Sequence, residues 1–171
     1  MCNSRRKFVQ NIMILFAFFT ISVARADIPQ CYDLGSLNGS YAIVGTYGAN
    51  IAIALAKRYF DGNGNLTGTF IVNEPVNGST TGARMIVTGT QVGTYTVNCD
   101  GTGVITRNLT TSTGVMTTQT DHFVITKAIV RHGHLIATAL EDASDVPSAI
   151  VPGGVFLKRS YTRLPSADHD D

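Results

Sequence analysis

Short runs of β-forming residues, separated by turn residues at regular intervals, constrain the fold of this chain more than any other feature. From Leu37 onward the sequence is rich in Thr, Val, Ile, Tyr and Phe, and Gly, Asn or Asp interrupts these runs at intervals of about ten to fifteen residues. The pattern is typical of antiparallel sheets built from hairpins. It predicts strands at 39–47, 50–60, 65–73, 83–97, 103–109, 119–130, 134–141 and 154–161.

Such a series of strands predicts an all-β fold, a single antiparallel up-and-down barrel of about eight strands over residues 37–161. The interior of such a barrel is filled by side chains or holds one small ligand. The 171 residues fit one domain, and 44% of them are hydrophobic, which is ample for a core. The formal net charge of +1 argues against electrostatic binding of nucleic acid.

Three turns punctuate the predicted strands. Residues 61–64 and 100–103 carry Asp-Gly and Gly at positions that tolerate positive φ, and 131–133 separates two runs of high β content, so all three predict hairpins. The polar segments 73–82 and 108–118 are predicted to be longer loops. Asp61-x-Asn63-x-Asn65 has the oxygen spacing that opens a calcium loop, but the later ligands are missing, which favours a turn.

Because successive side chains of a strand point to opposite faces, the alternation of polar and apolar residues shows which residues share a face. Leu66, Phe70 and Val72 share one face, and Tyr95 and Val97 share another. Apolar residues occur on both faces of 50–60, so we expect the N-terminal segment 27–36 to cover that strand.

The first 26 residues read as a cleaved signal peptide. Basic residues at 5–7 precede an apolar run from 12 to 23, and Ala24-Arg25-Ala26 forms the small-x-small pattern of a cleavage site before Asp27. The apolar run is shorter than the roughly 20 residues that span a bilayer, and no later stretch is longer, so an uncleaved anchor is the weaker alternative. We therefore expect an exported protein, periplasmic or secreted, that ends in a flexible polar tail at 162–171.

Cysteine usage points to the same compartment. Cys2 would leave with the signal peptide, and Cys31 and Cys99 would remain. A disulfide between them is the natural inference in an oxidising space, with two unpaired thiols as the alternative.

The opening of the first strand resembles a known family. Gly39-x-Tyr41 at its start and Lys158-Arg159 in the last strand resemble the lipocalin-type (calycin) barrels, in which a Gly-x-Trp packs under a basic residue of the final strand. The segments LNGSY, FDGNGNLTG and GTYTVNCDGTG are similar to secreted bacterial β-barrel proteins of unassigned function, related in architecture to calycins and allene oxide cyclases. The resemblance implies barrel-end packing of Gly39, Tyr41 and Arg159, but no particular activity.

Candidate catalytic or metal-binding residues are few. His132 and His134 suggest a metal site, but a hairpin explains their spacing better and no third ligand is near in sequence. Asp121 and His122 are neighbours on a strand, so their side chains point to opposite faces and are not expected to form an acid/base pair. We expect no catalytic residue, no metal and no cofactor.

The barrel lumen remains as the candidate site. Tyr41, Tyr47 and Tyr95 are the residues that could present hydroxyl groups to a ligand there. The expected function is non-catalytic binding of a small apolar or amphipathic molecule, or of a surface partner. One alternative is an allene oxide cyclase-like isomerase or cyclase, and the other is a structural or interaction module with a filled core.

Overall fold

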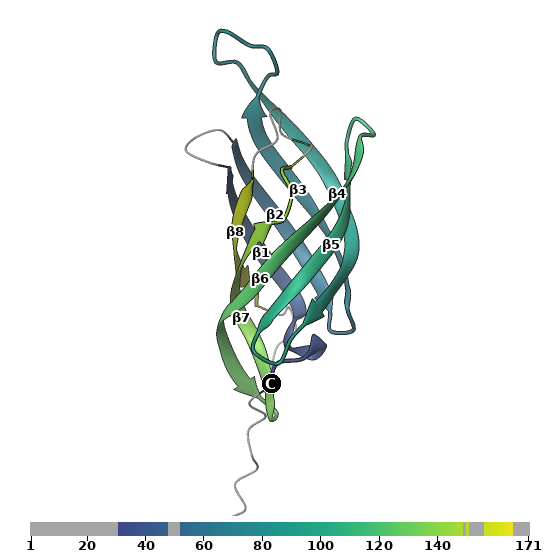
Figure 1. Cartoon of the computed structure of the whole chain (residues 1–171), viewed down its shortest axis with the longest axis vertical. Helices are drawn as coiled ribbons and strands as arrows, with labels where there is room; N and C mark the ends of the chain where they lie inside the picture. Colours follow the sequence, from purple (N-terminus) through teal and green to yellow (C-terminus); the bar gives the residue numbers. More distant parts are fainter. Residues whose placement is uncertain (1–30, 48–51, 149, 151–155, 166–171) are drawn as a thin grey trace, which may run out of the picture.

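The computed structural model describes residues 31–47, 52–148, 150 and 156–165. These residues form one 3₁₀ turn and eight strands, and the strands close into a single antiparallel barrel in chain order. The elements are η1 (Leu34–Ser36), β1 (Asn38–Tyr47), β2 (Ala52–Asp61), β3 (Asn65–Pro75), β4 (Arg84–Val97), β5 (Thr102–Thr111), β6 (Met116–Arg131), β7 (His134–Ser144) and β8 (Leu157–Arg163). The predicted up-and-down barrel is therefore confirmed (Figure 1).

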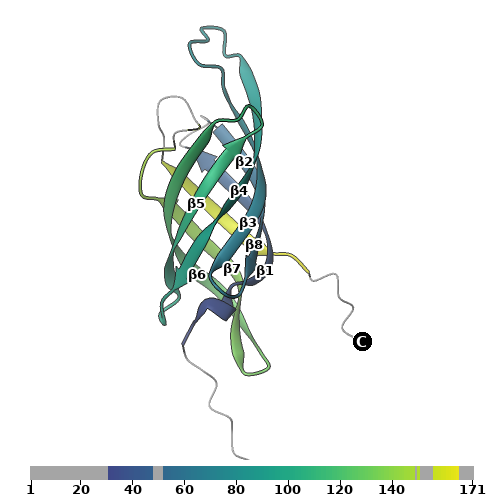
Figure 2. The ribbon, with the colours of Figure 1, turned by 90° about the vertical axis from the view of Figure 1, so that its right-hand side faces the viewer.

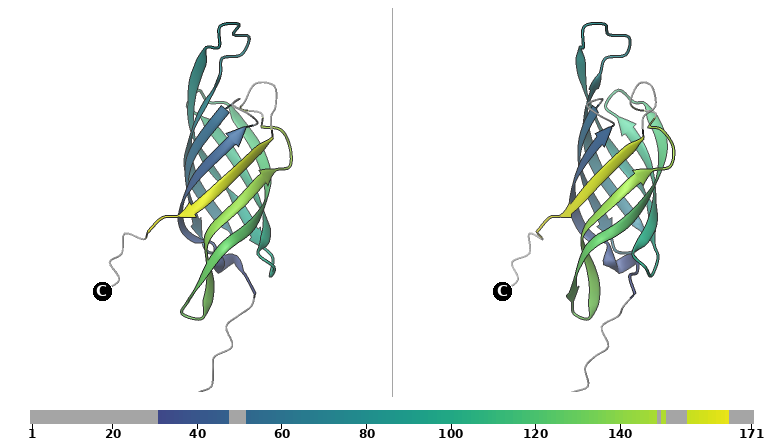
Figure 3. Two further views of the ribbon diagram at one scale, coloured as in Figure 1. Left: turned by 90° about the vertical axis from the view of Figure 1, so that its left-hand side faces the viewer. Right: turned by 60° about the vertical axis from the view of Figure 1, so that its left-hand side comes forward.

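The first and last strands close the barrel. β1 pairs with β2 from Asn38 opposite Asp61 onward, and its other edge pairs with β8, where Tyr41 lies opposite Arg163. Figure 3 shows β8 between β7 and β1, with all three strands tilted across the barrel wall. Closure leaves no unpaired strand edge among these eight strands, which is how barrels avoid edge-to-edge association.

The predicted hairpins form at the predicted turns. Gly62 and Gly64 adopt positive φ between β2 and β3, and Gly101 does so between β4 and β5. In the β6–β7 turn, His132 and Gly133 have φ of 50° and 80°, as a two-residue hairpin loop requires. The loop predicted over 108–118 is shorter than expected and spans only 112–115, because β5 continues to Thr111 and β6 begins at Met116.

The expectation that the N-terminal segment covers β2 is also wrong. Ile53 and Leu55 on the outer face of β2 are each 55% exposed. η1 instead contacts β7 and β4 at one end of the barrel, next to the projecting β6–β7 hairpin (Figure 2). Residues 27–30 and the predicted signal peptide lie outside the described residues.

η1 closes that end of the barrel. Asp33 caps it by accepting a hydrogen bond from the backbone N–H of Ser36, and the Ser36 hydroxyl accepts one from the Asp33 N–H in return. A disulfide joins Cys31 to Cys99, at the end of β4, as predicted. At the opposite chain end, Thr162 and Arg163 belong to β8 rather than to the predicted tail over 162–171, and residues 166–171 lie outside the described residues.

The lumen contains two apolar clusters. The η1-end cluster includes Leu37, Tyr41, Phe60, Tyr95 and Phe123. The opposite-end cluster comprises Ala52, Ala54, Phe70, Val72, Val87, Leu109 and Leu157. Between them the inward positions carry polar and charged residues. No helix in the described part of the chain is long and apolar enough to cross a membrane.

Candidate functional site

A belt of buried polar side chains crosses the middle of the lumen. It consists of eight inward-facing residues contributed by six strands, which we call the polar belt: Arg58, Gln91, Arg107, Gln119, Asp121, Asp142, Arg159 and Tyr161. Charged groups inside a protein are stable only when paired or hydrogen-bonded. The belt meets most of that requirement by linking its members to one another, but Arg58 Nε and Gln119 Nε2 are left without a hydrogen-bond partner in the described structure.

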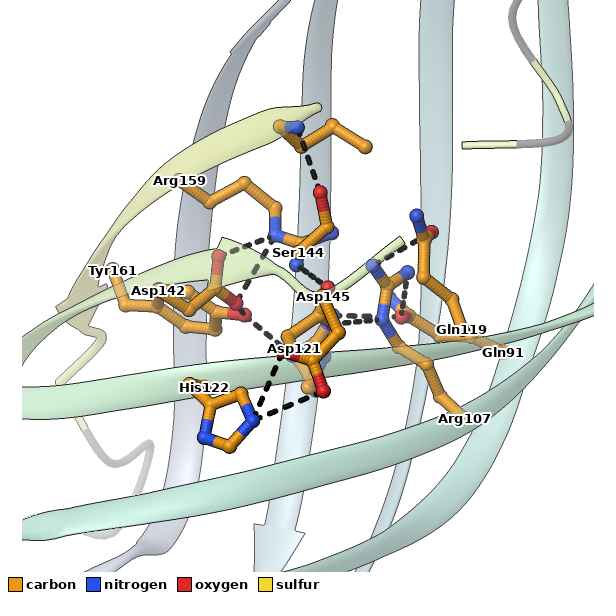
Figure 4. Close-up of polar contacts among 12 residues, drawn as sticks. Gln91, Arg107, Gln119, Asp121, His122, Asp142, Ser144, Asp145, Arg159 and Tyr161 are labelled. Atoms are coloured by element: carbon orange, nitrogen blue, oxygen red, sulfur yellow. Dashed lines mark hydrogen bonds and ion pairs between the residues drawn. The ribbon is translucent and has the colours of Figure 1, made fainter. Parts of the chain in front are cut away.

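Two aspartates hold two of the arginines. Arg107 Nε donates to Asp121 Oδ2 over 2.8 Å, and Arg159 forms an ion pair with the other oxygen of Asp121. Arg159 Nε also donates to Asp142 Oδ1 over 2.7 Å, across the β7–β8 pairing in which these two residues are direct partners. In Figure 4, Asp121 lies between the two arginines. The strands β5 to β8 are thus cross-linked inside the barrel.

The remaining contacts turn this chain of ion pairs into a closed ring. The Tyr161 hydroxyl donates to Asp142 and accepts a hydrogen bond from Arg58 Nη1. Arg58 Nη2 donates to Gln91 Oε1 over 2.9 Å, and the same oxygen accepts a longer bond of 3.4 Å from Arg107. The ring therefore includes side chains from β2, β4, β5, β6, β7 and β8, and it joins opposite sides of the lumen.

Glycines on neighbouring strands leave room for these long side chains. A Cβ at Gly45 would lie 2.9 Å from Cγ of Arg159, its direct partner on β8, which is closer than side chains tolerate. A Cβ at Gly68 would clash first with the Lys57 carbonyl oxygen and would also lie 3.0 Å from Nε2 of Gln91, its direct partner on β4. A glycine in a strand interior marks such a close approach.

Burial and neighbouring charges set the protonation of the belt. Burial, followed by the charges of Arg159 and Arg58, lowers the pKa of Arg107 to about 10, so this side chain remains a cation at neutral pH. Although burial alone would raise it, the pKa of Asp121 is lowered by Arg107 and Arg159. Burial raises the pKa of Tyr161, so its hydroxyl keeps its proton for Asp142.

A cavity of about 30 Å³ lies where the polar belt meets the opposite-end cluster. Its polar side is formed by Arg58, Gln91, Arg107, Gln119 and Arg159. Its apolar side includes Ala54, Phe70, Leu109, Ile150 and Leu157. One water needs about 10–15 Å³, so the cavity accommodates a group of a few atoms.

Two of the predicted ligand-lining tyrosines serve the closed end of the barrel instead. The Tyr41 hydroxyl donates to the Ala137 carbonyl over 2.7 Å, and the Tyr95 hydroxyl donates to the carbonyls of Leu34 and Leu37. Neither tyrosine lines the cavity. Tyr47 is the last residue of β1, and its side chain lies outside the described part.

The predicted barrel-end packing involves a different arginine. Arg163 lies over the Tyr41 ring, with its guanidinium carbon 6.0 Å from the ring centre, and a Cβ at Gly39 would lie 3.0 Å from Arg163 Nη2. Arg159 does not contribute to this contact, because it points into the lumen, where it pairs with Asp121 and Asp142. The basic partner is thus four residues later than expected.

Asp121 and His122 point to opposite faces, as their positions on one strand require. Asp121 is fully buried, whereas His122 is exposed and pairs with Asp145 over 3.0 Å. Asp61 organises a turn by accepting hydrogen bonds from the N–H groups of Asn63 and Asn65. Among the described residues, no group of three or more His, Cys, Asp or Glu is placed to hold a metal ion.

The sequence analysis missed most of the polar belt. Arg58 and Arg107 were not recognised as interior residues, although each lies on the same face as buried apolar residues of its own strand. The signal that could have found them was a charged residue on the same face of a strand as large apolar residues, because alternate residues of a strand share a face.

Comparison of the chain with models of known protein families, with curated proteins and with solved structures found no match. The closed eight-stranded antiparallel barrel is nevertheless compatible with the calycin-like architecture that the sequence resemblance implied.

Proposed function

We propose that this protein is an exported, non-catalytic barrel that binds a small amphipathic molecule in its lumen. The observation that carries the proposal is the cavity at the junction of the polar belt and the opposite-end cluster. Binding sites for small molecules combine mostly apolar walls with a few fixed polar groups, and this cavity has both.

The rigidity of the polar belt supports the proposal. Arg107 and Arg159 are held by carboxylates on neighbouring strands, and Gln91 is held by two arginines. A ligand would therefore meet groups whose positions are fixed before it binds, which lowers the entropic cost of binding. The wall opposite offers Phe70, Leu109 and Leu157 for an apolar part.

The resemblance to secreted bacterial barrels and the Cys31–Cys99 disulfide support an exported location, because disulfides persist in oxidising compartments. A calycin-like kinship fits this proposal, since such barrels include ligand binders. The residues that line the cavity point into the barrel, so the proposed site lies in the lumen rather than on the outer surface.

A structural module with a filled core is the second candidate. The small volume of the cavity favours it, because the two apolar clusters and the polar belt occupy most of the lumen. This candidate predicts that no small molecule stabilises the protein.

Thermal unfolding with two-carbon probes, which match the small volume of the cavity, tests the first proposal. We expect acetate or ethanol to raise the melting temperature of the wild type in a saturable manner, as a ligand of the folded state does. Ala54→Leu fills the cavity and should abolish the shift, whereas Thr46→Leu on the outer face of β1 should retain it. No shift with either probe would contradict lumen binding and favour the structural module.

A further inference from the structure

The polar belt carries more positive than negative charge. Its three arginines, Arg58, Arg107 and Arg159, face two aspartates, Asp121 and Asp142, and all five residues are at most 5% exposed. Buried charges are normally balanced by a partner of opposite sign. Both aspartates are engaged by Arg107 and Arg159, which leaves Arg58 without a carboxylate among the described residues.

No other group of the described interior neutralises Arg58. Tyr161, which contacts it, keeps its proton because burial raises its pKa. The third buried carboxylate, Glu74, is six residues beyond Gly68, which pairs with Arg58 across β2 and β3. At about 3.3 Å per residue, that separation is roughly 20 Å.

Hydrogen-bond donors are also in excess at the cavity. Arg58 Nε and Gln119 Nε2 are buried and have no hydrogen-bond partner in the described structure, and both residues line the cavity. The side-chain oxygen of Gln91 is already occupied by two arginines. Buried donors of this kind require an acceptor. A ligand that completes the site must therefore accept hydrogen bonds and carry negative charge.

We propose that the lumen cavity binds a short-chain carboxylate, whose anionic group is held by Arg58 and Gln119. This inference rests on the proposed function and specifies its ligand class. A guanidinium matches the planar, two-oxygen geometry of a carboxylate. The apolar wall suits a short aliphatic chain better than the fully polar surface of phosphate, and the cavity volume excludes a long chain in this conformation.

Isothermal titration of the wild-type protein with acetate and with ethanol, at constant ionic strength, tests the charge requirement. We expect acetate to bind at least tenfold more tightly than the alcohol, because only acetate neutralises Arg58. Equal affinities would overturn the carboxylate inference and leave lumen binding intact. Binding of neither compound would defeat the proposed function itself. Inorganic phosphate binding more tightly than acetate would also overturn the inference.

A pair of variants tests the role of Arg58. Arg58→Met should lower the affinity for acetate at least tenfold and leave that for ethanol within about twofold. Lys57→Met removes the same charge from the adjacent exposed position and should leave both affinities unchanged. Equal losses in the two variants would show long-range attraction rather than a site, and would overturn the assignment. If Arg58→Met does not fold, the comparison of the two compounds on the wild type still decides the proposal.

Discussion

Arg107 Nε donates to Asp121 Oδ2 over 2.8 Å inside the barrel, and neither side chain exposes more than 5% of its surface. Asp121 also pairs with Arg159, so one carboxylate balances two cations on different strands. Removing the Asp121 carboxylate would destabilise the folded protein, because Arg107 and Arg159 would stay buried with less negative charge to balance them.

Replacing Asp121 should therefore destabilise the barrel strongly. Asp121→Asn leaves Arg107 and Arg159 with one carboxylate fewer, and we expect a loss of about 3–5 kcal/mol in the free energy of unfolding, measured by urea denaturation. Glu141→Gln breaks the exposed pair with Lys158 and should cost less than about 1 kcal/mol. Similar losses in the two variants would argue against the balancing role of Asp121.

Asp121 should also make the stability of the folded protein fall at acid pH. Burial opposes its charge, but Arg107 and Arg159 lower the pKa of Asp121 below the unfolded value of about 3.9. Its stabilising contribution is then complete above about pH 4 and is lost as the pH falls towards the folded pKa. Urea midpoints measured from pH 7 to pH 2 should fall more steeply for the wild type than for Asp121→Asn. Exposed Asp61 and Asp100, whose pKa values are lowered by hydrogen bonds, affect both proteins alike. If the urea midpoints of the two proteins fell equally between pH 7 and pH 2, the lowered pKa would not belong to Asp121.

The glycines facing the polar belt should resist enlargement. Gly45→Val places its side chain against Arg159 Cγ, where even a Cβ would lie 2.9 Å away, and overpacking of this kind costs about 1–3 kcal/mol. Thr46→Val changes the next, outward-facing residue and should be nearly neutral. Calorimetric melting temperatures of the two variants provide the comparison, and a neutral Gly45→Val would show that the lumen has spare room at this point.

The hydroxyl of Tyr95 should stabilise the η1 end of the barrel. Tyr95→Phe removes the donor for the carbonyls of Leu34 and Leu37, and we expect a loss of about 1–2 kcal/mol together with faster amide exchange in η1. Tyr59 is exposed on the outer face, so Tyr59→Phe serves as the control. Unchanged exchange in η1 would mean that the cap does not depend on Tyr95.

The disulfide should add stability at the same end. Its two cysteines are 68 residues apart, and closing a loop of that length restricts the unfolded chain, which stabilises the folded state by about 4 kcal/mol as an upper figure. The double variant Cys31→Ser, Cys99→Ser should unfold at lower urea concentration than the wild type. Two free thiols in the native protein, detected by alkylation and mass spectrometry, would contradict the bond itself.

The barrel was predictable because local chemistry and global topology agree in this chain. Turn residues such as Asp61-Gly62 and Asp100-Gly101 mark hairpins, and the resulting antiparallel strands close in sequence order. The exposure of Leu55 was not predictable, because alternation separates the two faces of a strand without showing which face is inside. The same ambiguity led to the wrong expectation that β2 is covered on both sides.

The polar belt could be predicted only in part. Arg58 shares the parity of Phe60, and Asp121 shares that of Phe123, so the sequence showed that each lies on the same face as a large apolar residue, but not that this face is inside. Their partners could not be predicted, because contacts across the lumen depend on the stagger of strands around the barrel. Whether Arg159 or Arg163 lies over the Tyr41 ring depends in the same way on the register between β1 and β8, in which Tyr41 is opposite Arg163.

Native mass spectrometry of the protein purified from its own host, compared with the denatured mass, tests the central claim most directly. Lumen binding predicts a stoichiometric mass excess that disappears on denaturation and is absent from Ala54→Leu. The ligand released should be a small carboxylic acid. A native mass equal to the denatured mass would contradict the ligand-binding account and leave a barrel whose lumen is filled by its own side chains.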